Sequence, residues 1–510
     1  MKQLRNKLAA LAAGGLALAM TAVPALAAKD SMTIAFVDKF HTMEPYQTSA
    51  RQMLQMAYMI WDPLVLRDPD TGELQPHVAT SWSNPEPTIW EFDIRDDIVF
   101  HSGNKLTAES VRYTIEGRIL DPDVNSPRLP NFKWIKSVEV VDDDTFRIHT
   151  HEPYPIALQV LNTLYVMDEK WAAEHDFQYI QEHAMGSGPY QWVEWNKGSN
   201  VVLKKNPNYW MEGVPAIENV TIRIVPETAT RLAELFAGSV DFAMNLQLDQ
   251  LPSFEGRPNY EVLEGRIIRV DFWQFDSRER ASESPVSDVR VRKAIAHAIN
   301  KELIVERLVG RGGYRVNTPM SPYHFGVKED AGWYEYDPEK AKQLLAEAGY
   351  PDGFEIDLWQ YSDHQNLPNQ AAMQMLAKVG IKVNLNDYRG NTQQMGKLRR
   401  AGQVTGIGNF NWGSYNIFDA DAILVPFFDM ESSNNYAGNE ELSDILEKAR
   451  FSVDPEFRMA QYAKAQDIIY EEVYWMPFFG LVRFYGKSVD LDIKAGLDEV
   501  PRFQFAKWKN

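Results

Sequence analysis

Alternating apolar and polar side chains predict strands throughout the first half of the chain. The clearest case is the run WEFDIR at 90–95, in which three apolar residues alternate with three charged ones, the period-two pattern of a strand with one buried face. A turn cluster follows at 101–104, where Gly103 can adopt a positive φ. Thr107 then has the position and type of a helix N-cap. The stretch is therefore predicted to be a strand, a loop and a helix, with no catalytic constellation.

The same alternation, punctuated by turn residues, predicts further strands and two hairpins. The predicted strands are residues 32–37, 64–67, 138–141, 145–149, 220–225 and 240–244. Turns at 70–72 and 142–144 would close the hairpins.

Apolar residues spaced three and four apart predict helices, and short polar residues or glycines mark their ends. The predicted helices are residues 49–61, 228–237, 288–299, 300–310, 338–348 and 370–379. The predicted N-caps are Ser287, Asn300 and Asp337, and the predicted C-terminal glycines are Gly238 and Gly349. Strands at 356–359 and 381–385 flank the helix at 370–379, which predicts a βαβ-like unit.

Residues 1–27 are predicted to be a cleaved signal peptide. Three basic residues precede an apolar, alanine-rich run at 8–23, and Ala25-Leu26-Ala27 forms an A-x-A cleavage site. The apolar run is shorter than the roughly 20 residues of a spanning helix. We expect the mature chain to begin near Ala28 and to be exported to the periplasm.

Composition excludes several classes of protein. The 510 residues contain no cysteine, which excludes disulfides, thiol catalysis and a lipoprotein anchor. The formal net charge is −19, and loss of Lys2, Arg5 and Lys7 with the signal peptide takes it to −22. This acidity argues against nucleic acid and anionic membranes as partners. The length predicts two or three domains.

Several blocks resemble family 5 of the bacterial extracellular solute-binding proteins, which are the dipeptide, oligopeptide and nickel receptors of ABC importers. WEFDIR at 90–95 and VFHSGNKLTAESV at 99–111 are similar to the family's TF-x-LR strand, K-F-H-D-G turn and T-A-x-D-V helix start, with Ser102 in place of the usual Asp. Further similar blocks are GSGPY at 186–190, NPNYW at 206–210, residues 235–243, and DVRVRKAIAHAI at 288–299. The resemblance also implies that residues 79–82 end a helix.

The fold implied by this resemblance is α/β, a two-lobed periplasmic binding protein fold (type II-like) with an extra subdomain in the first lobe. Residues 28–60 and 184–275 would form the core of the first lobe, 61–183 the extra subdomain, 276–484 the second lobe, and 485–510 a return to the first. Because no Pro- or Ser-rich linker interrupts the chain, we expect strands to cross between the lobes.

Motifs that could indicate an enzyme or a metal site are interpreted as structural. The segment GLVRFYGKS at 480–488 resembles a phosphate loop but has five residues, not four, between its glycines. His149 and His151 lie on one strand face, with Glu152 next, and could hold a transition metal. We interpret the pair as part of an edge strand. We expect no catalytic residue, no metal and no cofactor.

The candidate ligand site follows an apolar strand within residues 406–428. Peptide receptors of the family carry a Trp, a Gly and often an Asp here, and that Asp faces the ligand's α-ammonium group. This chain has Ser414 or Tyr415 at the acidic position, and it has WQYS at 359–362, where the family's carboxylate-binding Arg is expected. Aromatic residues would form flat walls and polar ones would orient the solute. The predicted ligand-binding residues are Trp412, Gly413, Ser414, Tyr415, Asp419, Gln360 and Tyr361.

The resemblance implies a monomeric receptor that closes on its solute by hinge motion and passes it to an ABC permease and ATPase in the inner membrane. The two departures weaken the dipeptide interpretation. They favour a peptide-like or opine-like small solute, with a modified sugar or a metal chelate next. The rival functions are an exported hydrolase of peptides or glycosides, and a chaperone or sensor that shares the fold.

Overall fold

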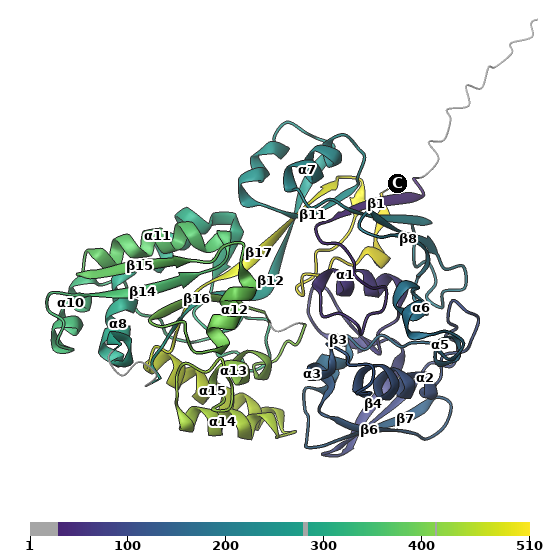
Figure 1. Cartoon of the computed structure of the whole chain (residues 1–510), viewed down its shortest axis with the longest axis horizontal. Coiled ribbons are helices and arrows are strands. Elements are labelled where there is room, and N and C mark those ends of the chain that lie inside the picture. The colour runs from purple at the N-terminus through teal and green to yellow at the C-terminus, as the bar shows by residue number, and fades with distance from the viewer. Residues whose placement is uncertain (1–28, 279–283, 414–415, 510) are drawn as a thin grey trace, which may run out of the picture.

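Two long antiparallel strands run through the middle of the molecule and join its two lobes (Figure 1). They are β12 (Tyr260–Phe275) and β17 (Trp475–Ser488). Near one end β17 pairs with a first-lobe strand, and near the other end β12 pairs with a second-lobe strand. Between these regions the register shifts, so that Arg266 lies opposite Val482 but Val270 lies opposite Gly480. Such a bulge bends the paired strands, here at the crossing between the lobes.

The computed structural model describes residues 29–278, 284–413 and 416–509. The predicted signal peptide lies outside these ranges. Within them, one sheet of eleven strands passes through both lobes in the order β15-β14-β16-β12-β17-β11-β1-β10-β9-β8, with β13 (Gly313–Arg315) beside β17. None of the helices in the described part of the chain is both long and apolar enough to cross a bilayer.

The first lobe is built on the strands at one end of this sheet. β1 is parallel to its neighbours β10 and β11, and β9 and β8 continue the sheet antiparallel. The strands are β1 (Ser31–Phe36), β8 (Tyr190–Asn196), β9 (Asn200–Lys205), β10 (Asn219–Ile224) and β11 (Phe242–Leu246). The helical elements are α1 (Arg51–Ile60), α7 (Thr228–Phe236) and the 3-10 turn Leu248–Phe254. A short pair, β18 (Leu491–Asp492) and β19 (Lys507–Trp508), lies near the C-terminus.

An extra subdomain with its own antiparallel sheet is attached to the first lobe. Its strand order is β4-β5-β7-β6, and a small hairpin of β2 and β3 adjoins it. The strands are β2 (Val65–Arg67), β3 (Leu74–Pro76), β4 (Ala79–Glu86), β5 (Ile89–Ile94), β6 (Ile135–Val140) and β7 (Thr145–Thr150). The helices are α2 (Ala108–Arg112) with its π-helical continuation Tyr113–Leu120, α3 (Leu129–Phe132), α4 (Ala157–Leu161), α5 (Glu169–Ala173) and α6 (Phe177–Glu182).

The second lobe covers the opposite end of the sheet with helices (Figure 1). Its strands are β14 (Phe354–Gln360), β15 (Ile381–Asp387) and β16 (Ile407–Trp412), of which β14 is parallel to both others. Its helices are α8 (Val289–Ala298), α9 (Lys301–Ile304), α10 (Pro338–Glu347), α11 (Asp363–Ala377), α12 (Thr392–Arg400), α13 (Asp421–Phe428), α14 (Glu440–Arg450) and α15 (Pro455–Glu471).

Each lobe buries its own apolar side chains. A large core under the first lobe and its subdomain includes Trp61, Phe92 and Tyr165. Separate clusters in the second lobe form around Trp273 and Phe272, which lie on the joining strand β12, and apart from residues of β12 and β17 these clusters consist of second-lobe side chains. Separate cores are what allow two bodies to move as units about the strands that join them.

Most of the predicted ends of elements are found in the structure. Thr107 caps α2 in a reciprocal capping box, Asp337 accepts the amides of Glu339 and Lys340, and Gly349 follows α10 with φ +93°. The predicted βαβ-like unit is β14, α11 and β15. Its helix begins at Asp363, about two turns before the predicted start, because a capping box at Ser362 opens it there.

Two local predictions were wrong. Residues 79–82, predicted to end a helix, begin strand β4, whose polar side chains face solvent while its backbone pairs with β5. The N-cap of α8 is Asp288 and not Ser287, because the Asp288 carboxylate accepts the amide of Arg290 at 2.8 Å.

Candidate functional site

A cavity of about 1540 Å³ lies between the two lobes and beside the strands that join them. Its wall receives residues from α1 and the 247–249 turn of the first lobe, from α11, α12 and β16 of the second, and from β12 and β17. Small-molecule sites are commonly ~300–1,000 Å³, so the space accommodates a solute of that class together with water. The residues that line it include Arg51, Arg269, Tyr361, Arg399, Arg400, Phe410, Asn411, Trp412, Gly413 and Arg483.

Trp412 and Gly413 stand at the end of β16 in this wall. The Trp412 ring packs edge-on against Phe427 with ring centroids 5.1 Å apart, and its Nε1 donates to the Ala422 carbonyl at 3.0 Å. A Cβ on Gly413 would lie only 3.0 Å from Cα and Cβ of Arg269. A residue without a side chain is therefore what allows the end of β16 to approach β12 so closely.

Tyr361 also lines the cavity, at the end of β14. Its hydroxyl lies 3.3 Å from the Asn411 amide and 3.4 Å from the Asn411 carbonyl, which fixes the ring beside β16. Burial raises the pKa of this phenol, so it stays neutral at physiological pH and offers a hydrogen-bonding group. The structure thus brings together Trp412, Gly413 and Tyr361 from the predicted set.

Two other predicted contacts lie away from the described wall of the cavity. Gln360 is fully buried, and its Oε1 accepts from Asn369 Nδ2 at 2.9 Å. Asp419 is buried against Arg458, whose Nη2 donates to it at 2.7 Å. Burial, together with the nearby Asp421, raises the pKa of Asp419 to about 6, although Arg458 opposes that rise. Ser414 and Tyr415 lie outside the described residues.

Three arginines converge on one buried carboxylate beside the strand crossing. Arg269 Nε and Nη2 donate to Glu499 Oε1 at 3.1 and 2.9 Å, and Arg483 Nε donates to Oε2 at 3.3 Å. Arg51 of α1 lies 4.0 Å from Oε2. Burial alone would raise the pKa of Glu499, but the three guanidinium groups hold it well below its usual value. We call Arg51, Arg269, Arg483 and Glu499 the hinge arginine cluster.

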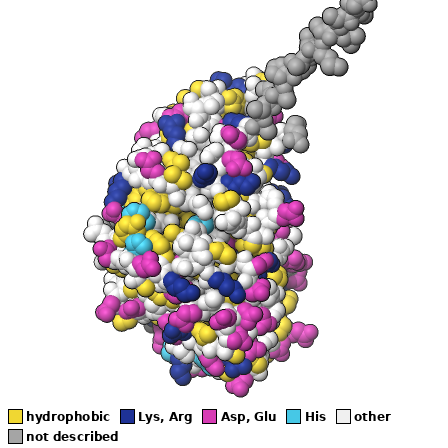
Figure 2. Space-filling model, turned by 90° about the vertical axis from the view of Figure 1, so that its right-hand side faces the viewer, with side chains coloured by type: hydrophobic (Ala, Val, Ile, Leu, Met, Phe, Trp, Pro, Cys, Tyr) yellow, Lys and Arg dark blue, Asp and Glu magenta, His cyan; other side chains and the backbone are white. Residues whose placement is uncertain are grey.

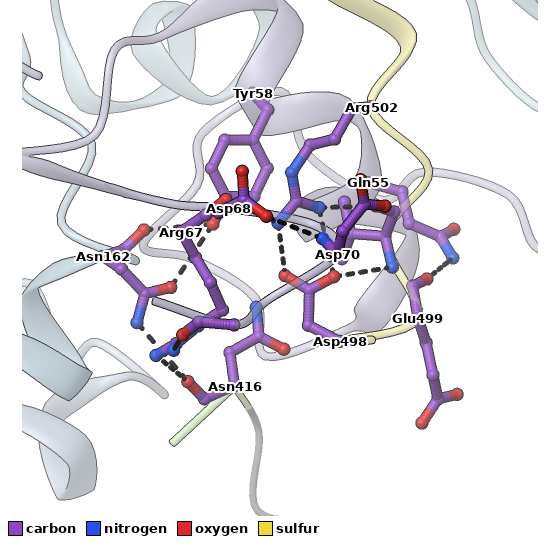
Figure 3. A network of polar contacts seen from close by, with 12 residues as sticks. Gln55, Tyr58, Arg67, Asp68, Asp70, Asn162, Asn416, Asp498, Glu499 and Arg502 are labelled. Carbon is purple, nitrogen blue, oxygen red and sulfur yellow. Dashed lines mark hydrogen bonds and ion pairs between the residues drawn. The ribbon is translucent and has the colours of Figure 1, made fainter. Parts of the chain in front are cut away.

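The hinge arginine cluster is fixed to both lobes. Arg269 Nη1 donates to the side-chain oxygen of Asn411 on β16 at 3.0 Å. On the first lobe, Gln55 Nε2 donates to the Glu499 carbonyl at 3.0 Å, and Arg502 forms an ion pair with the neighbouring Asp498 at 2.7 Å (Figure 3). Sequence reasoning missed this cluster because its members come from four separate segments.

Arg399 and Arg400 of α12 bring further positive charge to the side of the second lobe. The Arg399 guanidinium lies 4.7 Å from the ring centre of Phe410, 5.1 Å from that of Phe427 and 5.9 Å from that of Trp412. These are cation–π distances, so the predicted Trp412 also holds an arginine in place. Arg400, the next residue, is exposed at the cavity.

The chain that leaves the site strand returns to the first lobe near the strand crossing. We call residues 416–418 the docking segment. The Asn416 carbonyl accepts from Arg67 Nη2 at 2.8 Å, and Asn162 points at the same carbonyl (Figure 3). The Phe418 ring stacks 4.0 Å from the Arg67 guanidinium. The wall at Trp412 and Gly413 is therefore anchored on both sides of residues 414–415.

The other candidate motifs are structural in this molecule. The prediction of an edge strand was wrong, because His149 lies on β7, which pairs with β5 on one side and β6 on the other. His149 Nε2 lies 2.9 Å from Glu139 Oε2 on β6. The described residues contain no group of three or more His, Asp or Glu side chains arranged to hold a metal ion. The segment at 480–488 is part of β17, so its backbone amides serve the sheet and not a phosphate.

Comparison with known proteins adds a family match and relatives that span the chain. The sequence model of "Bacterial extracellular solute-binding proteins, family 5 Middle" matches residues 73–435. The glutathione-binding protein GsiB of Salmonella typhi is 29% identical over 480 residues, which are 92% of each chain. The substrate-binding protein CtaP of an ABC transporter from Listeria monocytogenes superposes with a TM-score of 0.85 at 20% identity over 95% of this chain and 100% of its own. HbpA2 of Haemophilus parasuis gives 0.83 at 22% identity over 94% and 100%.

Proposed function

Since the chain belongs to family 5 of the bacterial extracellular solute-binding proteins, we propose that it captures a peptide-like or opine-like small solute in the cavity between its lobes. The family binds solutes for ABC importers and does not consist of enzymes. The chain would deliver its solute from the periplasm to an ABC permease, whose ATPase supplies the energy for transport. The predicted signal peptide would direct it there.

The observation that carries this proposal is the cavity itself. It is large enough for a tripeptide-sized molecule, it lies where the two lobes meet, and the strands beside it change register. The relative that binds glutathione by name supports a solute with a peptide backbone. Within the cavity, we propose that Trp412 and Tyr361 supply flat surfaces and that Gly413 keeps the floor open. Gln360 and Asp419 would support the wall from behind.

We also propose that the two lobes follow the predicted boundaries, with the second lobe at 276–484 and the chain returning to the first lobe at 485–510. Closure about β12 and β17 would shift an equilibrium between open and closed forms. A solute can shift it only by binding the closed form more tightly. Residues from both lobes line one cavity, which provides the contacts that closure would complete.

Release and identification of the bound solute tests the proposal. The mature protein would be purified without denaturation, its bound molecules released in acid and identified by mass spectrometry. The refolded, solute-free protein would then be titrated with the candidate by calorimetry. We expect one equivalent of a small peptide-like or opine-like molecule, recovered unchanged after prolonged incubation. Conversion of that molecule into products, or a bound lipid or polysaccharide instead, would overturn the proposal.

A further inference from the structure

The cavity carries a charge opposite to that of the chain. Among the described residues, five arginines line it (Arg51, Arg269, Arg399, Arg400 and Arg483), but only two acidic residues do, Asp249 and Asp363. With Glu499 counted behind the wall, five positive charges face three negative ones, which leaves +2 on a chain of −19. On the outer face of the first lobe, by contrast, acidic side chains are spread among basic ones (Figure 2). Charge of one sign gathered in a cleft raises the local concentration of ions of the other sign.

The acidic residues of the wall are poorly placed to neutralise these arginines. The Asp363 side chain is 85% exposed and lies 3.6 Å from Arg389, which is not one of the arginines that line the cavity. Asp249 stands on the exposed 3-10 turn of the first lobe. Glu499 is shared among three guanidinium groups, so it balances only one of their three charges.

Among the described residues, two of the arginines keep donors that face no acceptor. Arg483 uses only its Nε on Glu499, and in the described part of the chain its two terminal nitrogens donate to no acceptor. The Arg400 side chain forms neither an ion pair nor a hydrogen bond with any described residue. A guanidinium with both terminal nitrogens available matches the two oxygens of a carboxylate. One such group comes from β17 at the hinge and the other from α12 of the second lobe.

We propose that the solute is an acid with at least one more carboxylate than it has ammonium groups, and that Arg483 and Arg400 receive its carboxylates. This inference rests on the proposed function and narrows its solute class. A zwitterionic dipeptide would bring an ammonium group into a wall of net positive charge. An acidic peptide or a carboxyalkyl amino acid would instead match the wall with its surplus carboxylate. The solute would contact Arg483 in the hinge arginine cluster and Arg400 on the other lobe together, so its charge would favour the closed form.

A panel of solutes graded by charge tests the inference on the whole mature protein. Calorimetry would compare glutathione, which has two carboxylates and one ammonium group, with its glycyl ethyl ester, with zwitterionic dipeptides and with N-carboxyalkyl amino acids. We expect the tightest members to be net negative, and loss of one carboxylate to weaken binding about tenfold or more. Tightest binding by neutral or cationic peptides would overturn this inference but leave the proposed function intact. Binding by no member of the panel would overturn both.

Charge-removing variants locate the subsite. Arg400 is exposed and makes no ion pair or hydrogen bond with any described residue, so the Arg400→Gln variant should fold normally. The Arg483→Gln variant tests the hinge arginine cluster. We expect each to weaken binding of the tightest acidic probe about tenfold and binding of its ester analogue less than about threefold. Arg290→Gln is the matched control, because it removes an exposed arginine paired with Asp288 on α8, away from the cavity. If neither cavity variant differs from this control with the acidic probe, the subsite is wrong.

Discussion

At the scale of single residues, the Glu499 carboxylate controls the electrostatics of the hinge. It is buried with φ +64°, a conformation that is uncommon outside glycine and that places the side chain among three arginines. Burial raises its pKa and the three arginines lower it by more, so the folded protein keeps this carboxylate ionised in acid. Without it, three guanidinium groups would repel one another beside the cavity.

Replacing Glu499 with Gln should change how stability depends on pH. As the pH falls below the ordinary pKa of 4.5, the unfolded chain takes up a proton that the folded chain does not. The contribution of Glu499 to stability is therefore complete above that value and is lost as the pH falls. Between about pH 5.5 and 3.5, wild-type protein should lose about 1 kcal/mol more free energy of unfolding than Glu499→Gln.

Urea unfolding at the two pH values measures this difference. Glu339→Gln is the control, because its side chain is 82% exposed and pairs only at the surface. Equal losses of stability in wild-type protein and Glu499→Gln would show that the carboxylate is not held ionised by the hinge arginine cluster.

Replacing Trp412 with Ala should weaken solute binding about tenfold or more, because the change removes a flat wall and the face on which Arg399 rests. Calorimetry with the released natural solute measures the affinity, and circular dichroism checks that the fold is kept. Trp195→Ala on β8 is the control, since Trp195 packs against the first lobe and away from the cavity. Unchanged affinity in Trp412→Ala would remove this residue from the site.

The aromatic part of the site could be predicted from sequence, but the charged part could not. Trp412 and Gly413 could be placed at the end of a strand from the resemblance to the family, and Tyr361 from its position just after the predicted strand at 356–359. The arginines of the cavity come from α1, β12, α12 and β17, and each is one basic residue in a chain that is acidic overall. Only the folded arrangement shows that they gather around one space.

At the scale of elements, the crossing of β12 and β17 depends on one close contact. β13 pairs with β17 at the register shift, with Tyr314 opposite Gly480. The Tyr314 hydroxyl donates to the Ile267 carbonyl inside the bulge at 2.9 Å. A Cβ on Gly480 would lie 2.1 Å from the Tyr314 ring, so this position admits only glycine while the ring is in place.

Gly480→Ala should therefore destabilise the protein by about 1–3 kcal/mol, the usual cost of overpacking. In a double-mutant cycle with Tyr314→Ala, the second substitution should remove most of that cost. Thermal or urea unfolding measures each variant. Gly312→Ala is the control, because a methyl group there would meet no atom nearer than 3.6 Å. A cost that persists without the Tyr314 ring would refute the proposed contact.

The helices and hairpins that could be predicted carry a local signal at their ends, whereas α3 to α6 and α12 to α15 were not predicted. Thr107 and Asp337 cap the first turns of their helices with hydrogen bonds, and Gly349 ends its helix with a positive φ. Each of these interactions depends on only one or two neighbouring residues. Residues 79–82 were assigned by resemblance and not by their own pattern, and they form a strand because β5 offers them a partner. Pairing between distant segments is the information that a local pattern lacks.

At the scale of the whole molecule, the strands β12 and β17 run from one lobe into the other (Figure 1). The absence of a Pro- or Ser-rich linker predicted that strands cross between the lobes, and β12 and β17 are those strands. No local pattern predicted the second connection, in which the docking segment contacts Arg67. Ile268, beside the strand bulge, packs with Phe418 and Leu497. Both connections therefore lie beside the strand bulge.

Arg67→Met should lower the free energy of unfolding by about 2–4 kcal/mol, because it leaves the buried Gly72 carbonyl without its side-chain donor and the Asn416 carbonyl with only the longer contact from Asn162 at 3.4 Å. It should also weaken solute binding, since the docking segment anchors the wall beyond Gly413. Arg112→Met, which breaks an exposed ion pair with Glu109, is the control. Stability equal to that of the control would mean that the docking segment does not depend on Arg67.

Small-angle X-ray scattering during titration of the solute-free protein with its released natural solute tests the central claim most directly. If the two lobes close on the solute and the protein does not change it chemically, the radius of gyration should fall as solute is added and become constant at one equivalent. It should then stay at that value over hours. A radius that does not change on binding, or one that returns to its starting value as the solute is consumed, would contradict the account.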